Sequence, residues 1–343
     1  PLYPGIVCFP ARGERARETA QDDRGRGASH HGLSPGVPFS SAVSSRHEAM
    51  SRTGASACMW VRVPPGRLLV VPGTRNGQRG DKRMNAPFVE VSHLVKRFPL
   101  KAGVFSRTVG AVHAVEDISF SISRGTTLSL VGESGSGKTT AGRCLLRLVE
   151  PDSGEVRFDG VDVLAADKDT LRALRRRMQI IFQDPYSSLN PRKSVFETIA
   201  TPLIVNKVFK DKKEMEKRVR SIMDTCGLTR RLENSYPHEL DGGRRQRIGV
   251  ARALALKPKV IICDEPVSAL DVSIQAQILN LLMDLQDEMG LTYIFITHDL
   301  LMVQQIADRV AVMQAGKIVE TGTVREIFKR PGHPYTRALL EAV

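Results

Sequence analysis

Residues 132–140 constrain this chain more than any other stretch, because they match the phosphate-loop pattern G-x4-G-K-(S/T) at every fixed position. They are Gly132, Glu133, Ser134, Gly135, Ser136, Gly137, Lys138, Thr139 and Thr140. The pattern alone can arise by chance, so its flanks matter. The apolar run 127–131 predicts a buried strand before the loop, and Ala141, Leu145 and Leu148 recur at helical spacing after it. The order of strand, glycine-rich loop and helix predicts a nucleotide site.

The residue types of this loop each suit a phosphate ligand. Glycines let backbone N–H groups approach the phosphates closely, and the start of the following helix adds a partial positive charge. We expect Lys138 to reach the terminal phosphates and Thr139 to ligate Mg²⁺. The competing interpretation is a glycine-rich turn without a ligand, which the flanking strand and helix disfavour.

Two carboxylates follow a second apolar run. Residues 260–263 predict a strand buried on both faces, and Asp264 and Glu265 stand at its end. Asp264 is suited to hold Mg²⁺, and Glu265 is suited to polarise an attacking water molecule. Acidic residues also end strands simply as caps, but the phosphate loop upstream favours the catalytic interpretation.

Two further apolar strands also end in polar residues. Gln183 follows 178–182, and Thr297-His298 follows 293–296. Open α/β sheets bind ligands at the carboxyl edge of their strands. There Gln183 could reach a metal-bound water and His298 could contact the terminal phosphate. Taken singly, such a glutamine is more often a cap and such a histidine more often structural.

The stretch 240–247 predicts a helix that starts beside a ligand. Asp241 suits a helix N-cap, and Gly242 and Gly243 would let a phosphate approach the bare N–H groups of the first turn. Lys257-Pro258 ends this helix. As an isolated motif the stretch is weak.

The segments before the phosphate loop predict a small antiparallel sheet. Residues 88–91 and 114–122 alternate apolar and polar side chains, as strands do. Between them Phe98 could stack on an adenine ring, or it could be an ordinary edge-strand hydrophobe. Phe105 is the weaker candidate for the same role.

Composition excludes several classes of protein. No stretch approaches the roughly 18 to 20 consecutive apolar residues that cross a bilayer. The formal charge of +13 could suggest nucleic acid, but residues 1–83 alone hold thirteen Arg or Lys against six Asp or Glu. We therefore expect no nucleic-acid partner. The cysteines (Cys8, Cys58, Cys144, Cys226, Cys263) show no paired metal spacing, which fits a reducing compartment.

Residues 1–83 differ from the rest of the chain. They contain eleven Gly and eight Pro and show no sustained helical or strand period, a composition typical of disorder. We expect a disordered leader or an artefact of gene annotation, with Met84 as the natural start. The alternative, a targeting arm, lacks a continuous apolar core near its beginning.

Taken together, these motifs resemble the ATP-binding subunits of ABC transporters over residues 84–343. The correspondence, in order along the chain, is Gly132–Thr139 as Walker A, Gln183 as the Q-loop, Leu240–Arg244 as the signature, Val260–Glu265 as Walker B, Ser268–Asp271 as the D-loop and His298 as the switch histidine. Residues 183–192 and His333-Pro334-Tyr335-Thr336 look like the oligopeptide, dipeptide and nickel uptake branch, in its second ATPase subunit type.

The resemblance implies a fold. It is an α/β fold of the P-loop NTPase (RecA-like) type, with a parallel-sheet core, an N-terminal antiparallel β subdomain and an inserted helical subdomain at about 186–257. The peptide-transporter motif would occupy about 330–343. ATP and Mg²⁺ are the implied cofactors, with Thr139, Gln183 and Asp264 around the metal.

The resemblance also implies partners. A second ABC ATPase subunit would form a head-to-tail heterodimer, or a homodimer, that traps two ATP molecules. Two membrane permeases would meet residues 183–190, with an extracytoplasmic solute-binding protein acting indirectly. The chain would then sit peripherally on the cytoplasmic face of the plasma (inner) membrane. Two alternatives stay open: an ABC ATPase not coupled to transport, and a non-hydrolysing regulatory partner.

The signature departs from the usual L-S-G-G-Q at two positions, Asp241 and Arg244. A carboxylate about 4 Å from a phosphate would be repelled by several kcal/mol per unit charge at an effective dielectric near 20. Three outcomes are open. Asp241 turns back as an N-cap, or Arg244 and Arg245 neutralise it, or the partner's ATP site is weakened.

Overall fold

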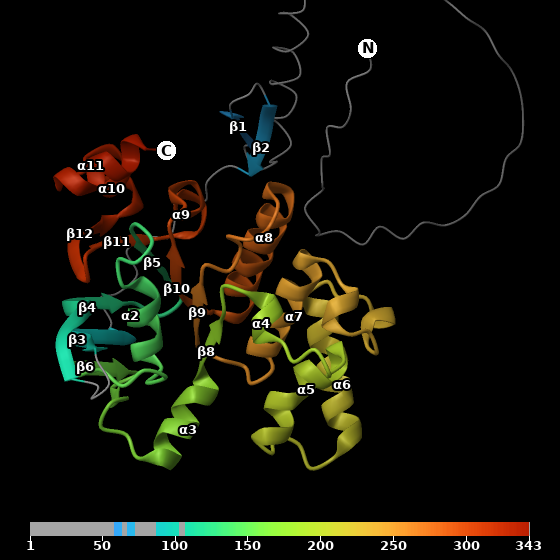
Figure 1. Ribbon diagram of the computed structural model, residues 1–343. Helices are drawn as coiled ribbons and strands as arrows, with labels where there is room; N and C mark the ends of the chain where they lie inside the picture. The colour runs from blue at the N-terminus through green and yellow to red at the C-terminus, as the bar shows by residue number, and fades with distance from the viewer. Residues whose placement is uncertain (1–57, 64–66, 73–86, 103–106, 343) are drawn as a thin grey trace, which may run out of the picture. The chain divides into compact units, whose positions relative to one another are not determined.

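The computed structural model describes residues 58–63, 67–72, 87–102 and 107–342 (Figure 1). The chain divides into two compact units, Pro1–Gly73 and Thr74–Val343, which we describe separately. In the first unit, β1 (Cys58–Val63) pairs antiparallel with β2 (Arg67–Pro72). These two strands lie within the segment 1–83 that we expected to be a disordered leader. The rest of that segment, and Met84 as the predicted start, lie outside the described ranges.

The second unit is built on a six-stranded sheet. Its strands are, in spatial order, β12 (Lys317–Thr323), β11 (Arg309–Gln314), β5 (Thr127–Val131), β10 (Thr292–Thr297), β9 (Val260–Asp264) and β8 (Met178–Ile181). All neighbours are parallel except β11 and β12, which form a hairpin. Every residue of β5, β9 and β10 is buried, as expected for parallel strands covered on both faces.

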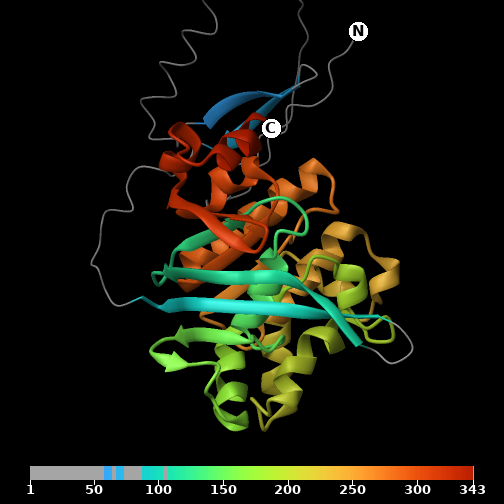
Figure 2. The same ribbon diagram turned by 60° about the vertical axis from the view of Figure 1, so that its left-hand side comes forward.

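A second, four-stranded antiparallel sheet has the order β4 (Arg107–Ile122), β3 (Val89–Ala102), β6 (Ser153–Phe158) and β7 (Val161–Asp162). Its two long strands, β3 and β4, run side by side in Figure 2. Both extend beyond the stretches that alternation predicts, because Phe98 still pairs with Val112 and Leu100 with Gly110. Irregular pairing within this ribbon interrupts the alternation of exposed and buried side chains, which hides the extra length in the sequence.

Helices fill the rest of the described chain. They are α2 (Lys138–Leu145), α3 (Lys168–Arg177), α4 (Pro185–Ser188), α5 (Val195–Val205), α6 (Lys212–Thr225), α7 (Gly242–Leu254), α8 (Val272–Met289), α9 (Leu300–Ile306), α10 (Val324–Lys329) and α11 (Pro334–Glu341), with 3-10 turns at Arg230–Leu232 and Pro237–Glu239. Within the described ranges, none of them is long and apolar enough to cross a membrane.

The helices α4 to α7 are inserted between β8 and β9 and gather on the side away from β3, β4 and β6 (Figure 1). Their apolar faces join one core cluster with α8 and one face of the parallel sheet. A second cluster lies between the other face and the antiparallel sheet, and holds α2. The predicted α/β class with these two additions is confirmed. Helices α9 and α11 were not predicted.

Candidate functional site

The phosphate loop links β5 to α2 and rests against the backbone of β4. Gly137 has φ +100°, and a Cβ atom there would lie 1.9 Å from the carbonyl oxygen of Ala114. Only glycine fits such a contact, and the left-handed conformation favours it as well. The close contact between Gly137 and β4 therefore helps to fix the conformation of the loop.

Lys138 is buried and holds the loop together from inside. Its Nζ donates to the carbonyl oxygens of Gly132 and Glu133, both at 2.7 Å, and to Ser136 Oγ at 3.3 Å. Burial lowers the pKa of Lys138, while the nearby carboxylates, Glu265 first, act to raise it. The ammonium group is thus partly desolvated, and its hydrogen-bond partners are uncharged. Its positive charge is therefore available to bind a phosphate.

Thr139 and Asp264 meet at the same edge of the sheet. Thr139 Oγ1 donates to Asp264 Oδ1 at 2.7 Å, and Asp264 is 1% exposed. Burial raises the pKa of this carboxyl, and the bond from Thr139 opposes that shift. A hydroxyl and one carboxylate fit Mg²⁺, which usually takes one or two carboxylates together with substrate phosphates. The described residues contain no group of three or more His, Cys, Asp or Glu side chains that could hold a metal ion.

Glu265 lies at the centre of the polar residues at this edge. Gln183 Nε2 donates to Glu265 Oε2 at 2.9 Å, and His298 Nδ1 lies 3.3 Å from Glu265 Oε1. The side chain of Glu265 is 13% exposed, whereas that of His298 is 55% exposed. Two residues predicted from separate strand ends, Gln183 and His298, therefore converge on the carboxylate predicted at a third. The contacts with Gln183 and His298 orient the Glu265 carboxylate, and its burial limits how much water surrounds it. Both features suit a general base.

The backbone at Glu265 is unusual for a non-glycine residue. Its φ of +44° lies in the left-handed region, which costs an L-residue about 1–2 kcal/mol. The Glu265 N–H donates to the carbonyl of Ile296 in β10 at 2.9 Å, which fixes that conformation. Such outliers persist where the surroundings over-determine them, commonly at active sites.

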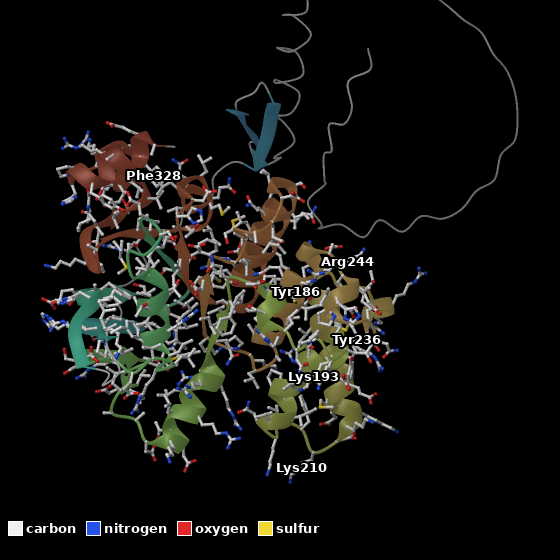
Figure 3. The ribbon with its side chains drawn as sticks, viewed as in Figure 1. Tyr186, Lys193, Lys210, Tyr236, Arg244 and Phe328 are labelled. Atoms are coloured by element: carbon white, nitrogen blue, oxygen red, sulfur yellow. The ribbon has the colours of Figure 1, made fainter. Side chains whose placement is uncertain are left out.

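Asp241 turns back onto the helix that it precedes. Its Oδ1 accepts from the Arg244 N–H at 2.7 Å, so it is the N-cap of α7, and Arg244 Nε lies 3.3 Å from its Oδ2. Arg245 instead donates to the Pro237 carbonyl at 2.7 Å and lies over the Tyr186 ring. Figure 3 labels Arg244 and Tyr186 on α7 and α4. Of the three outcomes that the sequence left open for Asp241, two therefore occur together: it turns back as an N-cap, and Arg244 pairs with it.

We expect Asp241→Ala to lower the free energy of unfolding by about 1 kcal/mol, since the cap is lost. Asp241→Ser should stay within about 0.5 kcal/mol of the parent, because serine caps equally well and an exposed ion pair contributes little. Urea unfolding followed by circular dichroism measures both. Equal destabilisation by the two substitutions would contradict the capping role.

Gly242 packs against the D-loop and Gly243 against α8 of the same chain, and a Cβ on Gly242 would lie 2.9 Å from Leu270 Cδ2. A Cβ on Gly243 would lie 2.6 Å from Ile274 Cγ2, so only glycine allows α7 and α8 to approach this closely. Asp271 occupies the N-cap position of α8, and its side chain makes no capping hydrogen bond in the described part of the chain. The assignment of Asp271 to the D-loop stays a prediction.

The predicted adenine contact is not joined to the loop by any described interaction. Phe98 lies in β3, 40% exposed, with Lys96 Nζ 5.3 Å from its ring centre. The loop instead contacts β4 at Ala114. Phe105 lies outside the described residues. Adenine stacking on Phe98 stays a prediction.

Two contacts to the phosphate loop were not predicted. The Tyr335 hydroxyl accepts from the Glu133 N–H at 3.1 Å, and the Gly316 N–H donates to the Ser136 carbonyl at 3.0 Å. The sequence predicts a hairpin turn at Ala315-Gly316 and contains the motif His333-Pro334-Tyr335-Thr336. Neither segment indicates in sequence that it contacts the phosphate loop.

Comparisons with known proteins agree on one family. Residues 115–268 match the ABC transporter family. The chain is 52% identical over 257 residues to the glutathione import ATP-binding protein GsiA of Pectobacterium atrosepticum, and 55% identical over 259 residues to that of Salmonella choleraesuis. Each match covers 75% of this chain and 41% of the relative, so the chain spans about two fifths of the length of these relatives.

Solved structures give the same picture. The ATP-binding cassette MJ0796, in a dimeric post-hydrolysis state with ADP and Pi, is 29% identical with a TM-score of 0.61, and the match covers 69% of this chain and 99% of that one. cbiO1 from Clostridium perfringens, part of the ABC transporter complex cbiONQ, is also 29% identical with a TM-score of 0.61, over 71% of this chain and 91% of that one.

Proposed function

This chain belongs to the ABC transporter ATP-binding family, and we propose that it is the ATP-binding and ATP-hydrolysing energy-coupling subunit of an importer. The observation that carries the proposal is the Glu265 carboxylate, placed between Gln183 and His298 and near Lys138 of a fully formed phosphate loop. A chain that only bound nucleotide would have no need of this oriented base.

Each residue has a task in that proposal. The loop N–H groups and Lys138 hold the phosphates, and Thr139 and Asp264 are placed to hold Mg²⁺. When bound, Mg²⁺ neutralises charge on the phosphates. Glu265 accepts a proton from the attacking water, and His298 and Gln183 orient Glu265.

A second cassette would complete the site. The Asp241 and Arg244 side chains are 54% and 55% exposed at the start of α7, where a facing subunit could meet them. The dimeric state of the structure of MJ0796 supports a pair of cassettes, which we propose to be head-to-tail. Because Asp241 caps α7 and pairs with Arg244 within its own chain, its charge would be partly compensated near the partner's phosphate. This favours an active cassette over a non-hydrolysing partner.

The permeases would meet residues 183–190, which lie between the parallel sheet and the inserted helices. The Tyr186 side chain in this segment is exposed, and Arg245 of α7 lies over its ring. A permease segment seated here would link its own movement to Gln183. The chain would then work peripherally at the cytoplasmic face of the membrane, with a solute-binding protein acting outside.

The names of the relatives, which refer to glutathione import, support the substrate class that we propose. Glutathione is a small peptide, so we propose oligopeptides or dipeptides as cargo, with nickel as the other possibility in this branch. The permeases and the binding protein would make the choice among them.

Transport by a reconstituted complex tests this function. The chain, with the permeases and second ATPase that co-purify with it from membranes, should drive ATP-dependent uptake of labelled dipeptide or glutathione into proteoliposomes. Uptake without ATP, or without this chain, should be at background. Co-purification with ribosomes or DNA, with no permease, would instead support an ABC ATPase unconnected to transport.

A further inference from the structure

The peptide unit between Gly132 and Glu133 is held from both sides. Its carbonyl oxygen accepts from Lys138 Nζ at 2.7 Å, and its N–H donates to the Tyr335 hydroxyl at 3.1 Å. Lys138 belongs to the loop itself, whereas Tyr335 lies about two hundred residues further along the chain. One peptide plane thus connects the phosphate-binding lysine to the C-terminal helix α11.

Tyr335 is itself held in place by polar contacts around the start of α11. Glu320 of β12 accepts from the N–H groups of Gly332 and His333, at 2.7 and 3.0 Å. The His333 Nδ1 accepts from the Tyr335 N–H at 3.2 Å and caps the helix. The hydroxyl therefore projects from an anchored turn.

Apolar packing joins α11 to the same region. Tyr335, Leu339 and Leu340 pack on a cluster that includes Val131, the residue directly before the loop. The cluster also includes Leu300 and Val303 of α9, the helix that follows His298. Helices α10 and α11 lie together beyond β11 and β12 in Figure 1, with Phe328 of α10 labelled in Figure 3. The C-terminal helix thus packs on the same apolar cluster as the residue before the phosphate loop and the helix after His298.

The hairpin of β11 and β12 adds a second outside contact. The Gly316 N–H donates to the Ser136 carbonyl at 3.0 Å, while the Gly316 carbonyl accepts from the Glu116 N–H at 2.8 Å. The loop is therefore supported at two peptide groups by residues of the C-terminal part of the chain.

We propose that Tyr335 is a positioning residue for ATP, which acts by fixing the Gly132–Glu133 peptide and, through it, the carbonyl to which Lys138 is anchored. This inference rests on the proposed ATP-binding function. Docking of α11 then sets how well the loop is preorganised, and nucleotide affinity depends on a motif that touches no phosphate. Preorganisation raises affinity because the loop does not have to be ordered on binding.

The substitution Tyr335→Phe removes the hydroxyl and keeps the ring in its apolar cluster. We expect the dissociation constant for ATP, and KM, to rise about 3- to 10-fold, as for the loss of one hydrogen bond. We expect kcat to stay within about twofold, because no reacting atom is touched. Tyr236→Phe, a partly exposed tyrosine away from the loop, is the matched control and should bind like the parent chain.

Binding of a fluorescent ATP analogue to the full chain gives the affinities. Amide hydrogen exchange of the peptide covering 131–137 tests the contact without nucleotide, and it should be faster in Tyr335→Phe than in the parent or Tyr236→Phe. An unchanged exchange rate, or an affinity equal to the parent's, would overturn the proposal. If the parent chain bound no ATP, both the proposed function and the role of Tyr335 would be wrong. If the parent bound ATP and Tyr335→Phe bound it equally well, only the role of Tyr335 would be wrong.

Discussion

Glu265→Gln should reduce ATP hydrolysis by the assembled transporter at least about a hundredfold, the usual contribution of a general base. Glutamine keeps the size of the side chain and its contacts with Gln183 and His298, but it cannot accept a proton from water. ATP binding should therefore persist. Phosphate release at saturating ATP measures the first effect, and equilibrium binding of an ATP analogue measures the second.

The matched control for this variant is Glu150→Gln. Glu150 is an exposed carboxylate that pairs with Arg147. Turnover of that variant should match the parent. Equal turnover of the parent and Glu265→Gln would remove the base from the mechanism and would favour the regulatory alternative.

Lys138→Ala should weaken ATP binding by about tenfold to more than a hundredfold, because hydrogen bonds to charged groups contribute about 1.5–3 kcal/mol each. The variant also leaves the Gly132 and Glu133 carbonyls without their shared donor, so the empty loop should lose order. Isothermal titration with ATP and Mg²⁺ gives the affinity.

Lys210→Ala provides the comparison, since Lys210 is an exposed lysine on the helical side of the domain (Figure 3). Its affinity should equal that of the parent. If Lys138→Ala bound ATP as tightly as Lys210→Ala, the phosphate-binding role of the loop would be wrong.

The parts of the site that lie close together in sequence could be predicted. The order of strand, loop and helix around Lys138 follows from one motif and its flanks, and the N-cap at Asp241 follows from local chemistry. The edge position of Gln183, Glu265 and His298 could be predicted as well, because parallel strands bring their carboxyl ends together.

Contacts between distant segments could not be predicted. Nothing near Tyr335 indicates that its hydroxyl meets Glu133, and nothing near Glu265 indicates a positive φ. Both depend on how the C-terminal helix and β10 pack after folding. The short helix α9 was missed because its seven residues are too few to show a clear period.

The left-handed backbone conformation of Glu265 means that the residue best for folding stability at this position is not the residue best for the proposed ATP hydrolysis. A glycine there would relax the chain and favour the folded state, yet it would remove the carboxylate on which the chemistry depends. A chain suited to folding alone would have glycine at this position, so the strain at Glu265 is the stability given up for the chemistry proposed above.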